Sequence, residues 1–126
     1  MIVLDTSALI FLTIDRGKLS PEAKAAIVRA DRVIVSAISI WEIGWKHKNG
    51  KLKLPIPFQE YVKGIEQIYT IEIHAVDLAT WMANLELEWQ HRDPADRTIV
   101  ATARLLDCEL VTSDKKILAF YPQAVW

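Results

Sequence analysis

The sequence has little cysteine, no long apolar run and no recognisable export signal, and each shortage excludes a class of protein. Cys108 is the only cysteine among 126 residues, which excludes an internal disulfide and argues against a zinc site built on thiolates. No apolar stretch approaches the roughly 20 residues that a membrane span needs. The amino terminus lacks a charged region followed by a small-residue cleavage site. We therefore expect a cytoplasmic protein that makes no use of a membrane.

The chain also lacks an excess of charge of either sign. Its 15 Lys and Arg residues nearly balance 16 Asp and Glu residues, which argues against a general nucleic-acid coat protein. The charge is nevertheless uneven, because residues 46–53 (KHKNGKLK) carry four lysines and a histidine without any acid. The length and the 52% hydrophobic content predict one globular domain over residues 1–126.

The spacing of apolar residues indicates alternating strands and helices. Short runs rich in Ile and Val predict strands at residues 2–4, 33–35, 70–73 and 110–112. Longer segments between them have helical character, at residues 20–30, 37–48, 57–69, 75–89 and 94–106. This alternation predicts an α/β domain with a mainly parallel sheet and helices on both faces. Ligands of such open sheets bind beyond the carboxyl ends of the strands.

Acidic residues follow two of the predicted strands. Asp5 comes directly after residues 2–4, and Asp114 lies two residues beyond residues 110–112. The carboxyl ends of parallel strands meet at one edge, so both acids are expected there. Each also has an ordinary interpretation, since Asp5 can cap a following helix and Asp114 can lie in a turn. Glu42 is either a solvated residue or, in its strongly apolar segment, a carboxylate that needs a partner or a cation.

The stretch HRDPADRTIVATARLL (91–106) holds two further acids with different expected roles. Pro94 suits the first position of a helix, which makes Asp93 the predicted N-cap and Asp96 the third helical residue. Asp96 either supports that cap or points toward the edge of the sheet. Several carboxylates at one edge would raise each other's pKa values, and a divalent cation would relieve the conflict. Mg²⁺ binds carboxylates together with phosphate oxygens, so this pattern indicates metal-assisted chemistry at phosphate.

Four segments resemble the acidic motifs of PIN-domain ribonucleases, in particular the VapC toxins of bacterial and archaeal toxin–antitoxin pairs. They are MIVLDTSAL (1–9), VSAISIWEI (35–43), DPADRTIVATA (93–103) and LVTSDKKI (110–117). The resemblance covers nearly the whole chain, in order and with family-like spacing. It implies a single three-layer domain with a central parallel sheet of four or five strands flanked by helices.

The resemblance also implies a site and partners. The catalytic and metal-binding residues would be Asp5, Glu42, Asp96 and Asp114, and the accessory residues would be Ser7, Asp93 and Thr112. The implied reaction is hydrolysis of RNA phosphodiester bonds with Mg²⁺, or alternatively Mn²⁺, and needs no histidine as general base. The implied partners are an RNA substrate, a cognate antitoxin protein and a second copy of the chain.

The basic segment and the aromatic residues have two interpretations each. Lys46, Lys48, Lys51 and Lys53 are candidates for RNA binding, or they form a solvated helix end. Arg97 is expected to lie near the acids, where it can pair with Asp93 or Asp96. The five tryptophans, among them the pair at positions 41 and 45 on one helix face, form either an apolar partner surface or part of the core.

Two other functions are compatible with parts of the pattern. A non-catalytic scaffold that binds RNA or an antitoxin would have the same fold, although the four acids argue against it. A phosphatase can also carry an aspartate at the end of its first strand, but it would need a second aspartate at the position of Ser7. A metal-dependent ribonuclease is therefore the favoured prediction.

Overall fold

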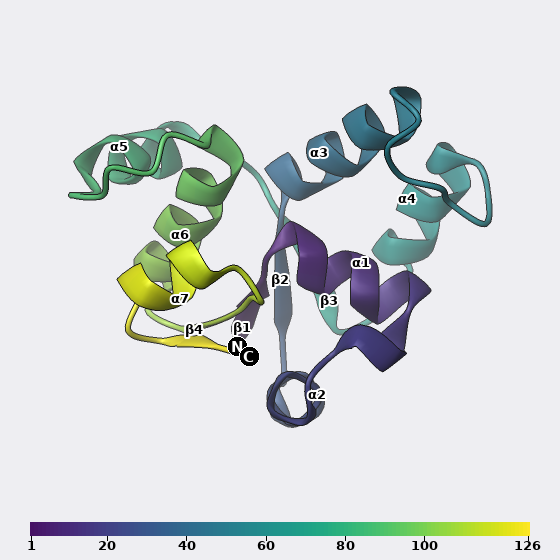
Figure 1. Cartoon of the computed structure of the whole chain (residues 1–126), viewed down its shortest axis with the longest axis horizontal. Coiled ribbons are helices and arrows are strands. Elements are labelled where there is room, and N and C mark those ends of the chain that lie inside the picture. The colour runs from purple at the N-terminus through teal and green to yellow at the C-terminus, as the bar shows by residue number, and fades with distance from the viewer.

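The computed structural model describes residues 1–126 and is built on a five-stranded sheet in which every pair of strands is parallel (Figure 1). The strands are β1 (Ile2–Leu4), β2 (Val33–Ser36), β3 (Ile71–His74), β4 (Glu109–Val111) and β5 (Ala124–Val125). The helices are α1 (Thr6–Ile14), α2 (Pro21–Arg29), α3 (Ala37–Lys48), α4 (Phe58–Glu66), α5 (Leu78–Glu86), α6 (Pro94–Leu106) and α7 (Lys115–Phe120), with a short 3₁₀ turn, η1 (Arg16–Lys18).

The order of the strands, β3-β2-β1-β4-β5, places β1 at the centre of the sheet. Strands β2 and β3 extend the sheet to one side of β1, and β4 and β5 extend it to the other, so the order of the strands reverses at β1. Leu4 pairs with Val35 on one side and with Val111 on the other, so the carboxyl ends of β1, β2 and β4 lie level. This reversal of strand order is where parallel α/β sheets bind ligands.

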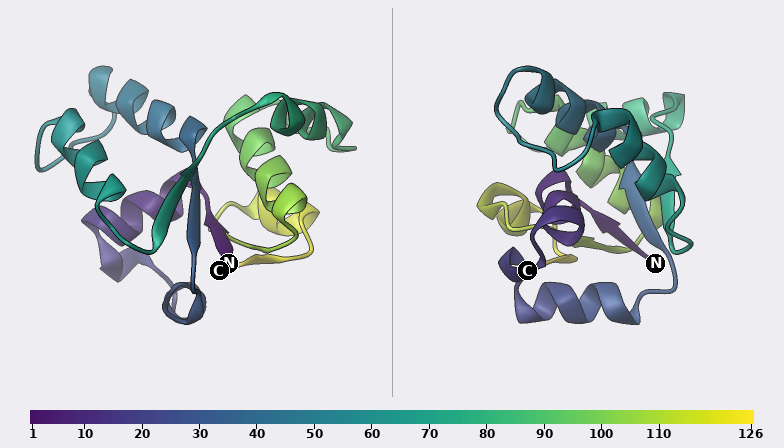
Figure 2. Two further views of the ribbon diagram at one scale, coloured as in Figure 1. Left: turned by 180° about the vertical axis from the view of Figure 1, so that it is seen from behind. Right: turned by 90° about the vertical axis from the view of Figure 1, so that its right-hand side faces the viewer.

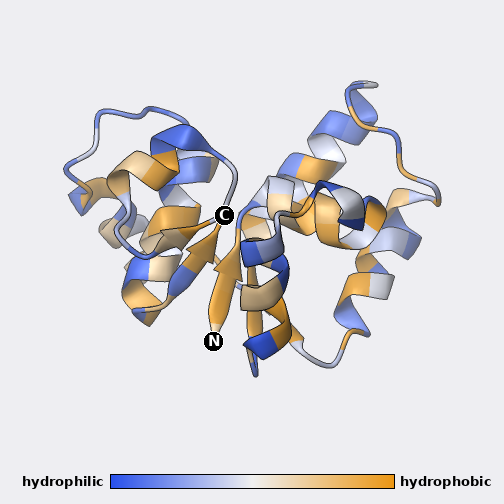
Figure 3. Ribbon diagram, turned by 60° about the horizontal axis from the view of Figure 1, so that its bottom comes forward, coloured by the Kyte–Doolittle hydropathy of each residue, from blue (hydrophilic) through white to orange (hydrophobic).

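Alternate residues of the central strands belong to two separate cores. Ile2 and Leu4 pack into a core with residues of α1, α2, α3 and α4, whereas Val3 packs with residues of α6 and α7. Figures 1 and 2 show these two groups of helices on opposite sides of the strands, and Figure 3 shows that the central strands are mostly hydrophobic. The prediction of an α/β domain with three layers is therefore confirmed.

Most helices begin at a side-chain cap that the sequence indicates. Ser20 accepts a hydrogen bond from the Ala23 amide at the start of α2, and Asp93 accepts one from the Asp96 amide at the start of α6. Helix α3 ends at Lys48, with Asn49 as its C-cap, and Gly50 follows with a φ of 71°, a conformation that glycine adopts without steric cost. These positions confirm the predicted boundaries of α2, α3 and α6 to within a residue.

Other elements differ from the prediction. Helices α4 and α5 are shorter than the expected 57–69 and 75–89, since α4 ends before the turn into β3 and α5 begins only after its cap. Strand β3 lies at the edge of the sheet and exposes Glu72 and Ile73, so it is not covered on both faces. The two-residue strand β5 has no distinct hydrophobic run and was not predicted. None of the helices has the length and hydrophobicity required to cross a membrane.

Candidate functional site

Asp5 is the most enclosed of the predicted acids. It follows β1 directly, is 4% exposed, and caps α1 by accepting a hydrogen bond from the Ala8 amide at 2.7 Å. Its other carboxylate oxygen accepts a short hydrogen bond from the Thr112 hydroxyl. Both oxygens of Asp5 are thus held in fixed directions at the carboxyl edge of the central strand.

Thr112 connects Asp5 to a second acid. Its fully buried hydroxyl donates to Asp5 and also accepts a hydrogen bond from the Asp114 amide at 3.0 Å. Asp114 caps α7, where its Oδ1 accepts hydrogen bonds from the amides of Lys116 and Ile117. One hydroxyl group therefore ties together the two neighbouring strand ends that carry Asp5 and Asp114.

Asp96 and Asp93 have separate positions at the start of α6. Asp93 is exposed and fills the cap, as predicted, through its 2.9 Å bond from the Asp96 amide. The Asp96 carboxylate takes no part in the cap, and its Oδ2 lies 2.7 Å from Nε2 of His91. The sequence pattern did not assign this contact to His91, although His91 lies in the loop that leads into α6.

The pKa values show that the acids share one environment. Burial raises the pKa of Asp5 from 3.8 to about 6; the Thr112 and Ala8 bonds oppose this shift, and the carboxylates of Asp96 and Asp114 add to it. Burial also raises the pKa of Asp96, against the hydrogen bond from His91, and the charges of Asp93 and Asp114 contribute. Asp5, Asp96 and Asp114 therefore lie within electrostatic range of one another.

Glu42 lies on α3, the helix that follows β2, and its charge is not among the causes of the pKa shifts of Asp5 and Asp96. Its carboxylate is partly buried and lies 3.6 Å from the Lys46 ammonium group, one helical turn away. A buried hydrogen bond of 3.0 Å from the Thr6 hydroxyl to Ser39 joins the start of α1 to α3, one turn before Glu42. Glu42 thus has a cation partner within the chain, and α3 is anchored beside Asp5.

The oxygen donors at this edge suit a hard divalent cation. No three Asp, Glu, His or Cys side chains lie close enough together to form a complete ligand set by themselves. Mg²⁺, however, keeps several water ligands and binds to only one or two carboxylates in many proteins. Asp5, buried and with a raised pKa, needs a nearby positive charge to be ionised at low cost at neutral pH. The residues therefore fit a cation that is held partly through water.

Ser7 and the lysine segment lie on different elements, α1 and the end of α3 with the loop after it. Ser7 lies in the first turn of α1 and is partly exposed. Lys48, Lys51 and Lys53 are exposed, and the loop that carries them is fixed by a 3.1 Å contact between His47 Nδ1 and the Leu52 carbonyl oxygen. The loop thus presents these three lysines to solvent from a defined backbone.

Arg97 does not pair with Asp93 or Asp96, contrary to one expectation. Its guanidinium group donates to backbone carbonyl oxygens of the last turn of α5 and of the segment between α5 and α6, and to one side-chain amide oxygen. The acceptors are the carbonyl oxygens of Asn84, Leu87, Trp89 and His91 and the Oδ1 of Asn84. Arg97 therefore holds the loop that carries His91. The sequence pattern missed this role because every residue has a backbone carbonyl, so residue types do not show which carbonyl oxygens accept from Arg97.

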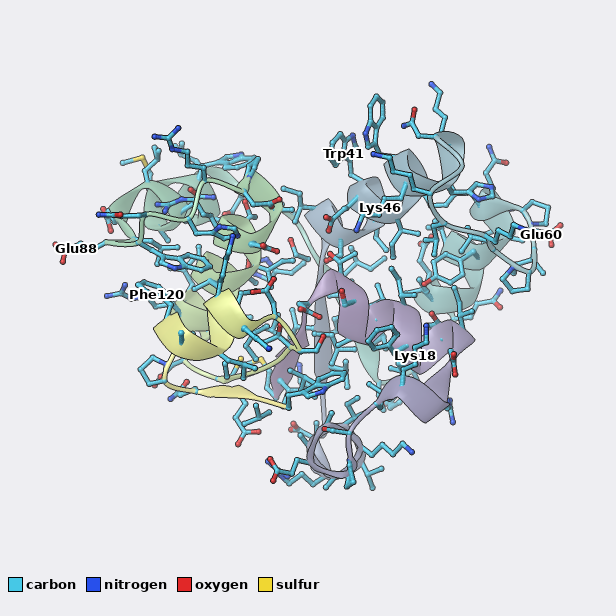
Figure 4. All side chains as sticks on the ribbon, in the orientation of Figure 1. Lys18, Trp41, Lys46, Glu60, Glu88 and Phe120 are labelled. Carbon is cyan, nitrogen blue, oxygen red and sulfur yellow. The ribbon has the colours of Figure 1, made fainter.

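The tryptophans are not all in the core. Trp41 and Trp45 are 62% and 54% exposed, and their rings stack on each other with centroids 5.9 Å apart. Figure 4 shows Trp41 on the side of α3 that faces away from the sheet. Helix α5 exposes a second apolar stripe at helical spacing, formed by Leu78, Trp81, Met82 and Leu85. The structure thus offers two apolar surfaces for a partner.

A separate apolar hollow of about 750 Å³ lies away from the acids. It is lined mainly by residues of α1, α2 and α4, and the hydroxyl groups of Thr13 and Tyr61 meet there at 2.8 Å. It contains no carboxylate group, so it lacks the groups that metal-assisted hydrolysis requires.

The chain matches a known protein family over nearly its whole length. The model of the PIN domain matches residues 2–121 of this chain. Ribonuclease VapC22 of Mycobacterium tuberculosis (strain ATCC 25618 / H37Rv) is 32% identical over 129 aligned positions, which cover 99% of this chain and 98% of that protein.

Solved structures share the fold at lower sequence identity. A toxin–antitoxin complex from Klebsiella pneumoniae contains a chain that superposes with a TM-score of 0.71 at 24% identity, covering 100% of this chain and 97% of that one. VapC20 of Mycobacterium tuberculosis, described as a toxin that cleaves the sarcin–ricin loop, superposes with a TM-score of 0.67 at 17% identity, covering 94% of each chain.

Proposed function

Because this chain belongs to the PIN-domain family, we propose that it is a divalent-metal-dependent endoribonuclease that acts as the toxin of a toxin–antitoxin pair. The observation that carries the proposal is the buried carboxylate of Asp5, joined through Thr112 to Asp114 and within electrostatic range of Asp96. This arrangement lies at the reversal of strand order, where the fold places ligands.

The proposed metal ligands are Asp5 and Asp96, with Asp114 and Glu42 completing the site directly or through water. The proposed ion is Mg²⁺, with Mn²⁺ as the alternative. A divalent cation bound there would activate water for attack on phosphorus and neutralise negative charge on the phosphate oxygens. The chain itself supplies fixed oxygen donors, because the Thr112 hydroxyl, the Ala8 amide and the His91 ring restrict how Asp5 and Asp96 can turn.

The substrate is proposed to reach the acids along the lysine segment of α3 and its following loop. The carboxylates at the edge of the sheet repel a polyanion, so binding requires cations close by. Lys48, Lys51 and Lys53 are exposed and available for phosphate groups. Lys46 lies beside Glu42, where it lowers the local negative charge.

The proposed protein partners are an antitoxin and a second copy of the chain, and the proposed location is the cytoplasm. Ribonuclease VapC22 and the Klebsiella pneumoniae toxin–antitoxin complex support the choice of an antitoxin. The apolar stripe of α5 and the Trp41–Trp45 pair support a protein partner, because isolated surface apolar residues are common but such stripes are not.

The decisive test is cleavage of RNA by the purified protein with Mg²⁺, with Mn²⁺ and with EDTA. We expect cleavage only with a divalent ion, and a loss of at least about 100-fold in rate for Asp5→Asn and for Asp96→Asn. Glu60→Gln is the matched control, since Glu60 is an exposed acid on α4, far from the site (Figure 4). Equal cleavage by all variants, or cleavage in EDTA, would contradict the proposal, and a wild type that binds RNA without cutting any would favour a scaffold.

A further inference from the structure

A polar hollow of about 510 Å³ lies beside Asp96 and Asp114, at the loop before α6 and the start of α7, whereas α3 and the lysine segment lie across the molecule (Figure 1). It is lined by Trp89, Gln90, His91, Arg92, Asp93 and Lys116. The hollow joins the site at two points. His91 contacts the Asp96 carboxylate at 2.7 Å, and the Lys116 amide donates to Asp114 at 2.8 Å. A ligand bound in the hollow would therefore lie directly next to the acidic residues.

The two cations of this hollow are not neutralised within the chain. Arg92 and Lys116 are exposed, and neither takes part in any of the five ion pairs of the structure. By contrast, Arg29 and Arg32 each donate hydrogen bonds to both carboxylate oxygens of a glutamate. Asp93 is the one acid in the hollow, and its Oδ1 already accepts the amide of Asp96. The hollow thus has cationic groups available for an external anion.

The wall that carries Arg92 is held in place. Arg97 donates to the carbonyl oxygens of Trp89 at 2.6 Å and His91 at 3.2 Å, on either side of Gln90 in the loop. The Trp89 ring stacks on Phe120 of α7 with centroids 4.6 Å apart and contacts the His91 ring at 4.8 Å. A loop that is fixed before binding loses less entropy when it holds a ligand.

We propose that this hollow binds a phosphate of the single-stranded RNA substrate next to the scissile one, with Arg92 and Lys116 as the donors. The inference rests on the proposed function. A guanidinium group and an ammonium group are the side chains that bind phosphate best. With the lysine segment on one side of the acids and this hollow on the other, the RNA strand crosses the acidic residues between two cationic sites. The subsite thereby offsets repulsion that the acids exert on the strand.

The test is the affinity for a fluorescently labelled single-stranded RNA oligomer in EDTA, measured by anisotropy at several salt concentrations. We expect Arg92→Gln and Lys116→Gln each to weaken binding by about 3- to 10-fold and to lower the salt-dependence slope by about 0.7. Arg92→Lys should retain most of that slope, because it retains the charge. The matched control is the double variant Arg104→Gln, Lys24→Gln, which removes one exposed Arg and one exposed Lys outside the hollow.

The outcomes separate the subsite from the proposed function. If the double variant Arg92→Gln, Lys116→Gln has the same RNA affinity and the same salt slope as the control double variant, the subsite is overturned. Binding of a labelled polyglutamate decamer is measured in the same way. If the variants lose affinity for this peptide and keep their affinity for RNA, the hollow binds an acidic protein segment and the RNA subsite is overturned. If the wild type does not cut RNA with Mg²⁺, the proposed function is wrong. If the wild type cuts RNA but Arg92→Gln, Lys116→Gln binds RNA as the wild type does, only the subsite is wrong.

Discussion

Asp5→Asn is expected to weaken or abolish activity and yet stabilise the metal-free protein at neutral pH. The carboxyl group is buried, and its pKa is raised from 3.8 to about 6, chiefly by that burial. A raised pKa means that the folded state favours the protonated form. Between about pH 4 and pH 6 the folded chain therefore binds more protons at this group than the unfolded chain does, and stability falls as the pH rises through this window.

The size of the effect follows from the shift. A shift of about two pKa units corresponds to a penalty of about 3 kcal/mol once Asp5 is ionised, above pH 6. Asparagine removes the charge and keeps an acceptor for the Ala8 amide. It leaves the Thr112 hydroxyl proton without its present acceptor, which costs about 1 kcal/mol. The expected net gain is about 2 kcal/mol at pH 7.5, and the expected net loss is about 1 kcal/mol below about pH 4.

The measurement is urea unfolding of the wild type and Asp5→Asn in EDTA at several pH values between 3.5 and 7.5. The two curves of unfolding free energy against pH should cross at about pH 4.5, where the penalty of ionising Asp5 in the folded state equals the cost of the lost hydrogen bond. Taking the difference between the two proteins removes the contribution of the other acids. A difference that stays constant over this pH range would refute the reasoning, because it would mean that Asp5 titrates alike in the folded and unfolded states.

Three further predictions concern the ion, the loop and the helices. Saturating Mg²⁺ should raise the Tm of the wild type, by about 10 °C at 100 times its Kd, and raise that of Asp5→Asn much less in the same scans. Arg97→Met should lower the free energy of unfolding by about 3 kcal/mol, because several carbonyl oxygens lose their donor; a loss under about 1 kcal/mol in urea would mean that water replaces it. Gly64→Ala, with open space around it, should stabilise α4 by about 0.5–1 kcal/mol, whereas Gly44→Ala should gain less because its methyl group would lie 2.8 Å from the Phe58 ring.

Much of the fold could be predicted because its signals are local. The apolar runs that became β1, β2 and β4 are buried on both faces, so they read as continuous hydrophobic segments. Strand β5 could not be predicted, since two residues cannot show a period and their pairing with β4 depends on the turn before them. Strand β3 was found only approximately, because an edge strand exposes part of its surface and loses the continuous apolar pattern.

The candidate site was predictable to the extent that helix starts and strand ends coincide in this fold. The cap rules correctly separated Asp93, which fills the cap of α6, from Asp96, whose carboxylate takes no part in the cap and contacts His91. The contacts of Arg97 and His91 were beyond reach, since both depend on where a loop returns in space. The exposure of Trp41 and Trp45 was equally undetermined, because a pair four residues apart can face a core or the solvent.

The causes of the raised pKa of Asp5 also separate two explanations for why a cation would stabilise this edge of the sheet, namely repulsion between the carboxylates and burial of Asp5. Mutual repulsion of carboxylates was the expected reason, but at Asp5 burial is the largest cause and the charges of Asp96 and Asp114 are the smallest. Neutralising a neighbour should therefore relieve little of the penalty. In an Asp96→Asn background, Asp5→Asn should still stabilise the metal-free protein at pH 7.5 by nearly as much as it does in the wild type. If that gain falls by more than half, repulsion and not desolvation is the main cost of holding the acids together.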